Sequence, residues 1–125
     1  LAERRAKTSP MRDVAGLLRS LNYLAATAEL DADAVTEHNG GRRLAVIREF
    51  SKRAETVFLE EYRQATKTCP DLASDEADIR NLLGIFLLEK AAYEIAYEAR
   101  NRPKWLPIPL AGMSAIIEQL LDEGQ

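Results

Sequence analysis

The sequence has very little of the chemistry that metal-binding and nucleophilic sites require. Its 125 residues include one histidine, His38, and one cysteine, Cys69. A zinc site needs several thiolate or imidazole ligands, and a catalytic triad needs a nucleophile paired with a base, so neither is expected. We expect His38, in the Glu37–Gly41 loop, to be an ordinary surface histidine. A single cysteine also excludes an internal disulfide and is typical of the reducing cytoplasm, where we expect the protein to act.

Phosphate loops, long apolar runs and a concentrated positive charge are absent as well. The six glycines fit neither a dinucleotide-binding fingerprint nor a phosphate-binding loop. No apolar run approaches the ~18 residues that span a membrane, and the first residues lack the apolar core of a signal peptide. Seventeen basic and 20 acidic side chains give a formal net charge of -3, which does not favour nucleic acid. We therefore expect neither a membrane nor a nucleic acid as partner.

The composition that is present is that of a folded protein. Hydrophobic residues make up 46% and charged residues 30% of the chain, so residues 1–125 are expected to form a single domain with a real core. The sequence starts at Leu1 without an initiator methionine, and we expect it to be a segment of a longer protein. Such a segment would expose an apolar patch where the rest of the protein had packed, and self-association would follow.

The spacing of the apolar residues predicts an all-α fold. No segment shows the alternation of a strand, whereas apolar residues recur every three or four positions in four segments. Serine before Pro10 is typical of a helix start, and Pro70 is expected to end the second helix. Ser74 and the acids after it mark another start. The predicted helices span about 10–30, 42–67, 75–101 and 110–122.

Two further expectations concern the buried faces and the prolines. Prolines at 103, 107 and 109 predict a stiff, extended segment over 102–109, with Trp105 as a packing anchor. The first helix is expected to bury one apolar face, made of Val14, Leu17, Leu18, Leu21, Leu24 and Ala28. The second is expected to bury Leu44, Ile47, Phe50, Ala54, Val57, Phe58, Tyr62 and Ala65.

The third predicted helix carries the most informative face. Lys90, Tyr93 and Tyr97 follow each other at steps of three or four residues and therefore share one side of the helix. A tyrosine offers a flat apolar ring and a hydroxyl, which suits the wall of a sugar-binding cavity. The same spacing also fits core tyrosines whose hydroxyls reach the surface, and spacing alone favours that simpler interpretation.

Two stretches of the sequence resemble a known enzyme family. They are residues 9–20 (SPMRDVAGLLRS) and 93–110 (YEIAYEARNRPKWLPIPL), and together they resemble the C-terminal part of bacterial maltokinases. That family is often fused behind a trehalose synthase. The resemblance implies a two-lobed, protein-kinase-like or aminoglycoside-phosphotransferase-like fold. It also implies transfer of the ATP γ-phosphoryl group to maltose, which gives maltose 1-phosphate for α-glucan (glycogen) synthesis.

The resemblance also implies roles for individual residues. Asp13 would brace the catalytic loop of the full-length enzyme, and one departure is Asn22, which stands where the family often has an aspartate. The catalytic aspartate, the metal-binding acids and the phosphate-binding lysine would precede this segment, so the chain holds no catalytic residue and would be inactive alone. The full-length enzyme would need ATP and Mg²⁺. The residues implied to contact maltose are Tyr93, Tyr97, Glu94, Glu98, Asn101 and Arg102.

The sequence leaves one rival from another class, a non-catalytic helical interaction module that dimerises through its long second helix. The two hypotheses differ in where they place Tyr93 and Tyr97. A sugar-pocket wall leaves both rings beside a cleft. An interaction module buries them in a core or in a symmetric interface.

Overall fold

A computed structural model of the chain describes residues 10–34, 40–69 and 76–124. Over these ranges the chain forms four α-helices and one short 3-10 helix, and no strand. The all-α prediction is thus confirmed. The elements are α2 (Met11–Ala34), α3 (Gly40–Thr66), α4 (Glu76–Asn101), η1 (Pro103–Trp105) and α5 (Pro107–Glu123).

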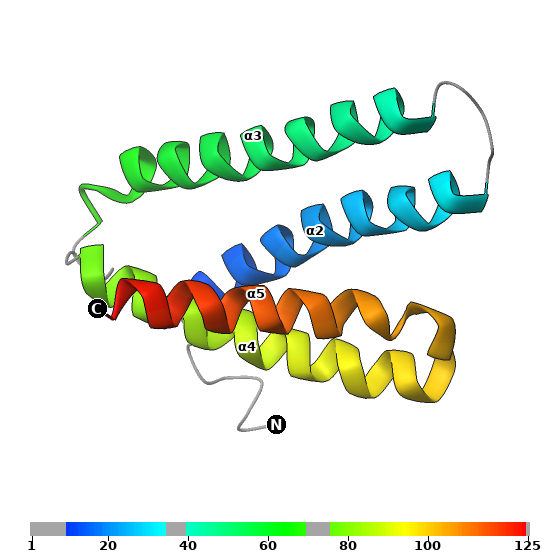
Figure 1. Cartoon of the computed structure of the whole chain (residues 1–125). Helices are drawn as coiled ribbons and strands as arrows, with labels where there is room; N and C mark the ends of the chain where they lie inside the picture. The colour runs from blue at the N-terminus through cyan, green and yellow to red at the C-terminus, as the bar shows by residue number, and fades with distance from the viewer. Residues whose placement is uncertain (1–9, 35–39, 70–75, 125) are drawn as a thin grey trace.

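Helix α2 lies at the centre of the arrangement. It packs against α3 on one side and against α4 on the other, while α4 and α5 form a second helical pair joined through η1 (Figure 1). Helix α3 is the outermost element, with its backbone packed along α2. At its C-terminal end a side chain also reaches α4, where Arg63 forms an ion pair with Glu76 at 3.3 Å. None of the described helices is apolar over enough of its length to cross a membrane.

The helices agree with the predicted segments, with differences at their ends. Helix α2 continues to Ala34, beyond the predicted end near Leu30. The added turn, Asp31–Ala34, is half alanine, the strongest helix former, and contains no proline. Helix α3 begins at Gly40 rather than 42. The loop histidine at 38 and the caps predicted at Ser9 and Ser74 lie outside the described residues.

The prediction of an extended segment over 102–109 is wrong. Residues 103–105 form a 3-10 helix, and α5 starts at Pro107, three residues before the predicted start. The first amide groups of any helix have no intrahelical partner, so prolines in the first turn remove no hydrogen bond. Pro103 starts η1, and Pro107 and Pro109 both lie in the first turn of α5. These prolines therefore start helices.

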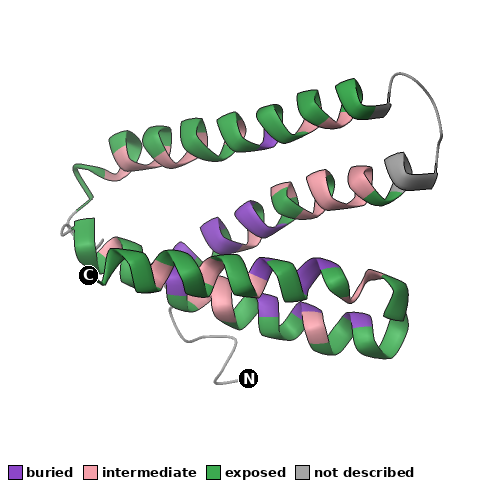
Figure 2. Cartoon of the chain, viewed as in Figure 1, coloured by how far each residue is buried: buried purple, intermediate pink, exposed green. Residues whose placement is uncertain are grey.

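The core lies between α2, α3 and α4. Its buried centre consists of Met11, Val14 and Leu18, and side chains from the C-terminal half of α3 and the N-terminal half of α4 pack around it. Trp105, the predicted packing anchor, is the last residue of η1 and is half-buried. Figure 2 shows that most of α3 is exposed on the side away from α2.

The predicted buried faces are partly wrong. Leu17 and Leu24 of α2 are 41% and 50% exposed, whereas Ala15 and Arg19 are buried instead. Phe50 and Val57 of α3 are each 59% exposed. The cause is that α2 has two neighbours, and its buried surface is set by both of them. The backbone of α3 packs along α2 only, and α4 meets only side chains near its C-terminal end, so a narrow side of α3 is covered.

Candidate functional site

Tyr93 and Tyr97 form an exposed pair of stacked rings on α4, here called the tyrosine face. The two residues are one helical turn apart, and their ring centroids lie 6.4 Å from each other with an interplanar angle of 21°. The residues are 62% and 43% exposed. The helix thus presents two nearly parallel aromatic surfaces to the outside, as residues four positions apart allow.

Cationic side chains lie at both ends of the tyrosine face. The Lys90 ammonium is 5.2 Å from the centroid of the Tyr93 ring. The Arg102 guanidinium is 5.4 Å from the centroid of Tyr97 and 4.1 Å from that of Trp105. A cation over an aromatic ring is attracted by the negative face of the π system. These contacts hold the rings in place and leave N–H donors beside them.

A hollow of about 360 Å³ adjoins the tyrosine face between α2 and α4. Across it, the Arg12 guanidinium bonds to the Glu89 carboxylate at 2.7 Å and lies 5.6 Å from the centre of the Phe86 ring. Asp13 enters the hollow from the first turn of α2, where its backbone N–H donates to the Pro10 carbonyl at 3.1 Å. The full lining is Arg12, Asp13, Gly16, Phe86, Glu89, Lys90 and Tyr93.

Glu94 lies away from the tyrosine face, in a buried ion pair with Arg19 of α2. The Arg19 Nε–H donates to both Glu94 oxygens, at 3.0 and 3.3 Å, and its Nη2 donates at 2.6 Å. Only 4% of the Arg19 side chain and 11% of the Glu94 side chain are exposed. Arg19 also donates to the Asn22 amide oxygen at 3.0 Å. The bidentate geometry of the Arg19–Glu94 pair is the strongest form of a side-chain hydrogen bond.

Glu98 is almost fully buried one turn further along α4. Its two carboxylate oxygens accept hydrogen bonds from Arg102, at 3.0 Å from Nε and 2.6 Å from Nη2. The hydrogen bond to Glu98 raises the pKa of Arg102, so this guanidinium stays charged. Glu98 thereby fixes the position of Arg102 between Tyr97 and Trp105.

Tyr23 of α2 completes this buried polar region. Its hydroxyl is buried and has no hydrogen-bond partner in the described part of the chain. Burial, together with the negative charges of Glu94 and Glu98, raises the pKa of Tyr23 to about 12. Its ring lies 5.7 Å from the Arg19 guanidinium and 6.5 Å from the Trp105 ring.

The residues singled out from the sequence thus separate into two groups. Tyr93, Tyr97 and Arg102 lie together at the surface, and Asp13 joins them through the hollow. The second group holds this surface in place and consists of Glu94 and Glu98, in buried ion pairs, and Asn101, whose amide donates to the Tyr97 carbonyl at 2.9 Å.

Sequence reasoning missed Arg19, which is separated from its partner Glu94 by 75 positions. No local signal marked it, because Arg19 lies about 140° around the helix from Val14, off the predicted apolar face. Arginine is almost never fully buried unless it is paired, so its burial could be inferred only once the packing of α4 against α2 was known.

The described side chains do not assemble a metal centre, since no three His, Cys, Asp or Glu residues among residues 10–34, 40–69 and 76–124 group closely enough to hold an ion. What the arrangement offers is a binding surface of aromatic rings, cations and carboxylates. A scan of the sequence against models of known protein families finds no match.

Proposed function

We propose that the tyrosine face and the adjoining hollow bind a sugar, as one wall of the maltose pocket of a maltokinase that acts in the cytoplasm. In this proposal the chain is a helical part of the kinase, which in the family that it resembles is often fused to trehalose synthase. ATP, Mg²⁺ and the phosphoryl-transfer residues belong to another part of the enzyme. The single observation that carries the proposal is the stacked, exposed pair Tyr93 and Tyr97.

The chemistry of the rings supports a sugar ligand. A pyranose has an apolar face of C–H groups and a rim of hydroxyls, and an exposed tyrosine matches both with its ring and its own hydroxyl. Tyr93 and Tyr97 are one turn apart, about 6 Å along the helix. This spacing offers one aromatic platform to each ring of a disaccharide.

The surroundings of the rings support the same ligand class. Lys90 and Arg102 place N–H donors at the two ends of the tyrosine face. Asp13 lines the same hollow as Tyr93 and supplies acceptor oxygens there. The hollow, about 360 Å³, is within the range of small-molecule sites. Sugar hydroxyls both donate and accept, so they suit a mixed lining better than a single ion would.

Glu94 and Glu98 have supporting roles in this proposal. Their carboxylates are already engaged by Arg19 and Arg102. The Glu94–Arg19 pair joins α4 to α2 and so helps to determine which side of α4 carries the tyrosines outward, whereas Glu98 holds Arg102 beside Tyr97. Asn101 also has a supporting role, because its amide donates to the Tyr97 carbonyl at the end of α4.

The test is an NMR titration of the isotope-labelled chain with maltose. We expect maltose to shift the amide signals of α4 around Tyr93 and Tyr97, and Tyr93→Ala and Tyr97→Ala each to weaken binding at least about tenfold by removing a stacking surface. Tyr93→Phe keeps the ring and is expected to retain most of the affinity. Ile85→Ala is the matched control, because Ile85 is exposed to a similar extent, 60%, on the same helix.

Two results would contradict the proposal. One is an absence of maltose-dependent shifts on α4 at millimolar sugar. The other is binding that survives both tyrosine-to-alanine variants. The rival hypothesis, a non-catalytic interaction module, instead predicts concentration-dependent broadening of the Tyr93 and Tyr97 signals without sugar. The exposure of both rings supports the sugar-facing proposal over a role in the core of the chain itself.

A further inference from the structure

The outer side of α3 carries a stripe with the spacing of a coiled-coil seam. The steps along it alternate between three and four residues, which keeps the stripe within a sector of about 100° on the helix. Its three apolar members, Val46, Phe50 and Val57, are 63%, 59% and 59% exposed. The stripe, called here the α3 seam, consists of Arg43, Val46, Phe50, Arg53, Val57 and Glu60.

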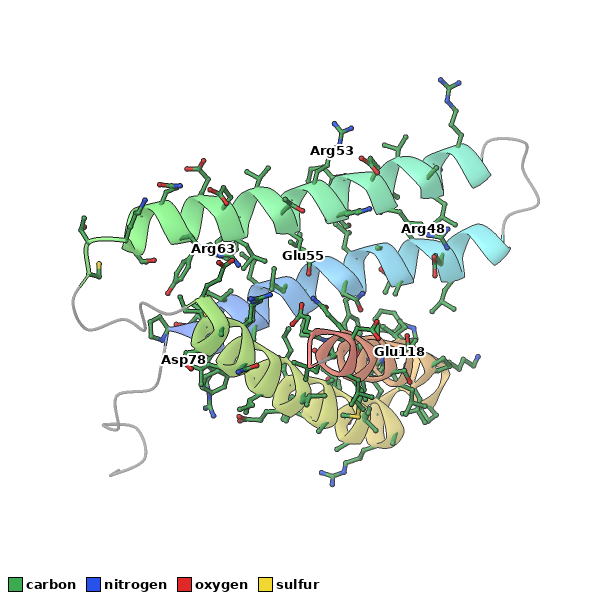
Figure 3. All side chains as sticks on the ribbon, turned by 60° about the vertical axis from the view of Figure 1, so that its left-hand side comes forward. Arg48, Arg53, Glu55, Arg63, Asp78 and Glu118 are labelled. Atoms are coloured by element: carbon green, nitrogen blue, oxygen red, sulfur yellow. The ribbon has the colours of Figure 1, made fainter. Side chains whose placement is uncertain are left out.

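The α3 seam points away from the rest of the molecule. In Figure 3 the labelled Arg53 projects outward from α3, whereas Glu55 and Arg48 lie on the side of α2. Arg48 forms an ion pair with Glu29 of α2. Ser51, near the middle of α3, is buried on the opposite side from the seam. The packing of α3 on α2 therefore leaves the whole seam uncovered by the described helices.

The order of the charged residues along α3 is mostly opposite to the order that stabilises a single helix. Cations are expected near a C-terminus and anions near an N-terminus, because of the helix dipole. Here five of the six basic residues of α3 lie between positions 40 and 53, and only Arg63 lies in the last turn. Three of its four acids, Glu55, Glu60 and Glu61, lie in the second half, and no acid lies in the first turn. On the side of α3 that faces α2, Glu29 of α2 pairs with Arg48, and this partly explains a basic residue in the first half of α3. On the seam, no ion pair in the described ranges joins Arg43 or Glu60 to another helix.

We propose that the α3 seam binds the α3 seam of a second copy of this chain, in an antiparallel, two-fold symmetric pair. Reversing the direction brings the basic half of each helix beside the acidic half of the other. It also makes the two helix dipoles antiparallel, which is their favourable orientation. A two-fold interface requires a self-complementary surface. A helix that is basic in its first half and acidic in its second half meets that requirement when it pairs with an antiparallel copy of itself.

The spacing of the seam fixes the register of the pair. A two-fold axis beside the Ser51–Lys52 step places Val46 opposite Val57 of the second copy. It also places Phe50 opposite Arg53, where a cation can lie on the aromatic ring. The same register sets Arg43 opposite Glu60. All six members of the seam thereby receive a complementary partner, as the alternate seam positions of antiparallel coiled coils do.

Dimerisation through this helix was part of the rival hypothesis, but it is compatible with the sugar proposal and independent of it, because the α3 seam and the tyrosine face lie on different helices. Sedimentation equilibrium of the full chain, from low micromolar to submillimolar concentration, is expected to show a monomer–dimer equilibrium. Val57→Glu is expected to raise the dimer dissociation constant at least about tenfold by placing a charge in the seam. The matched control is Ile85→Glu, at an equally exposed apolar position of α4, and it is expected to leave the dimer unchanged. A chain that stays monomeric throughout overturns the proposal.

Charge reversal tests the register. Arg43→Glu alone and Glu60→Arg alone each put like charges opposite one another and are expected to weaken the dimer. The double variant restores opposite charges in both symmetric pairs and is expected to recover dimerisation. Because these surface substitutions leave the core untouched, circular dichroism is expected to be unchanged. The register is overturned if the double variant does not recover dimerisation. It is also overturned if none of the three variants changes the strength of self-association.

Cross-linking tests the direction of the pair. The variants are made in a Cys69→Ser background, because Cys69 is an exposed thiol. With a short bis-maleimide, the double variant Val46→Cys/Val57→Cys is expected to form a covalent dimer. Val46→Cys alone is expected to form none, because its two copies lie about 16 Å apart along an antiparallel pair. Efficient cross-linking of the single variant indicates a parallel pair and overturns the proposal.

Discussion

Replacing Arg19 with methionine is expected to remove a large share of the stability of the fold. The substitution leaves the Glu94 carboxylate buried without the three hydrogen bonds that now satisfy it. Breaking one side of a buried ion pair typically lowers the free energy of unfolding by about 3–5 kcal/mol. For a domain of this size, each kcal/mol shifts Tm by about 4 °C, so Tm is expected to fall by about 12–20 °C.

The double variant Arg19→Met/Glu94→Leu is expected to recover most of this loss. Two apolar side chains of suitable volume leave no uncompensated charge, and such replacements are often neutral or stabilising. The free energies of unfolding come from urea denaturation followed by far-ultraviolet circular dichroism. The matched control is Arg12→Met, because Arg12 and Glu89 form a similarly short pair, 2.7 Å, with side chains 51% and 56% exposed. That change is expected to lower stability by less than about 1 kcal/mol.

The reasoning is refuted by either of two results. If Arg19→Met and Arg12→Met have equal effects, burial does not determine the strength of the pair. If the double variant loses as much as the sum of Arg19→Met and Glu94→Leu, the two side chains do not act as a unit.

Three further predictions concern the polar region around this pair. Gly112→Ala is expected to lower the free energy of unfolding by about 1–3 kcal/mol in urea denaturation, although alanine favours helix, because its Cβ would lie 2.4 Å from Nη1 of Arg19. Glu98→Gln keeps the shape but loses the charged acceptor of Arg102, so the same assay is expected to show a loss of about 1–3 kcal/mol. Burial raises the pKa of Tyr23 to about 12, so the unfolded chain releases this proton first as the pH rises. Stability is therefore expected to fall between pH 10 and 12. Tyr23→Phe is expected to make that fall shallower, and an unchanged slope would contradict the assignment.

The helices could be predicted from the sequence because apolar spacing and helix-start residues are local signals. The prolines around Trp105 show the limit of such signals. Proline fixes one backbone angle at a value common to extended chains and to the first turn of a helix. Apolar spacing placed the start of this helix near 110, and the structure begins it at Pro107, so the spacing did not decide between the two conformations.

The site could be predicted only in part. The spacing of Tyr93 and Tyr97 placed both rings on one side of α4, and the structure shows them stacked there. Whether that side is buried depends on where α2 and α5 pack, which no local pattern encodes. The positions of Glu94 and Glu98 could not be predicted for the same reason, because their partner surfaces form only when distant helices meet.

The contact between Arg102 and Trp105 makes the fluorescence of this chain a local optical reporter. The chain has a single tryptophan, so selective excitation observes the η1 corner alone. A guanidinium 4.1 Å from the indole centroid lies close enough to influence the emission, and Arg102 is held there by a carboxylate on α4. A molecule that settles on Tyr97 and displaces Arg102 therefore changes the colour or intensity of the emitted light. A separation of α3 from α2 is expected to leave this emission unchanged, because α3 does not pack against η1.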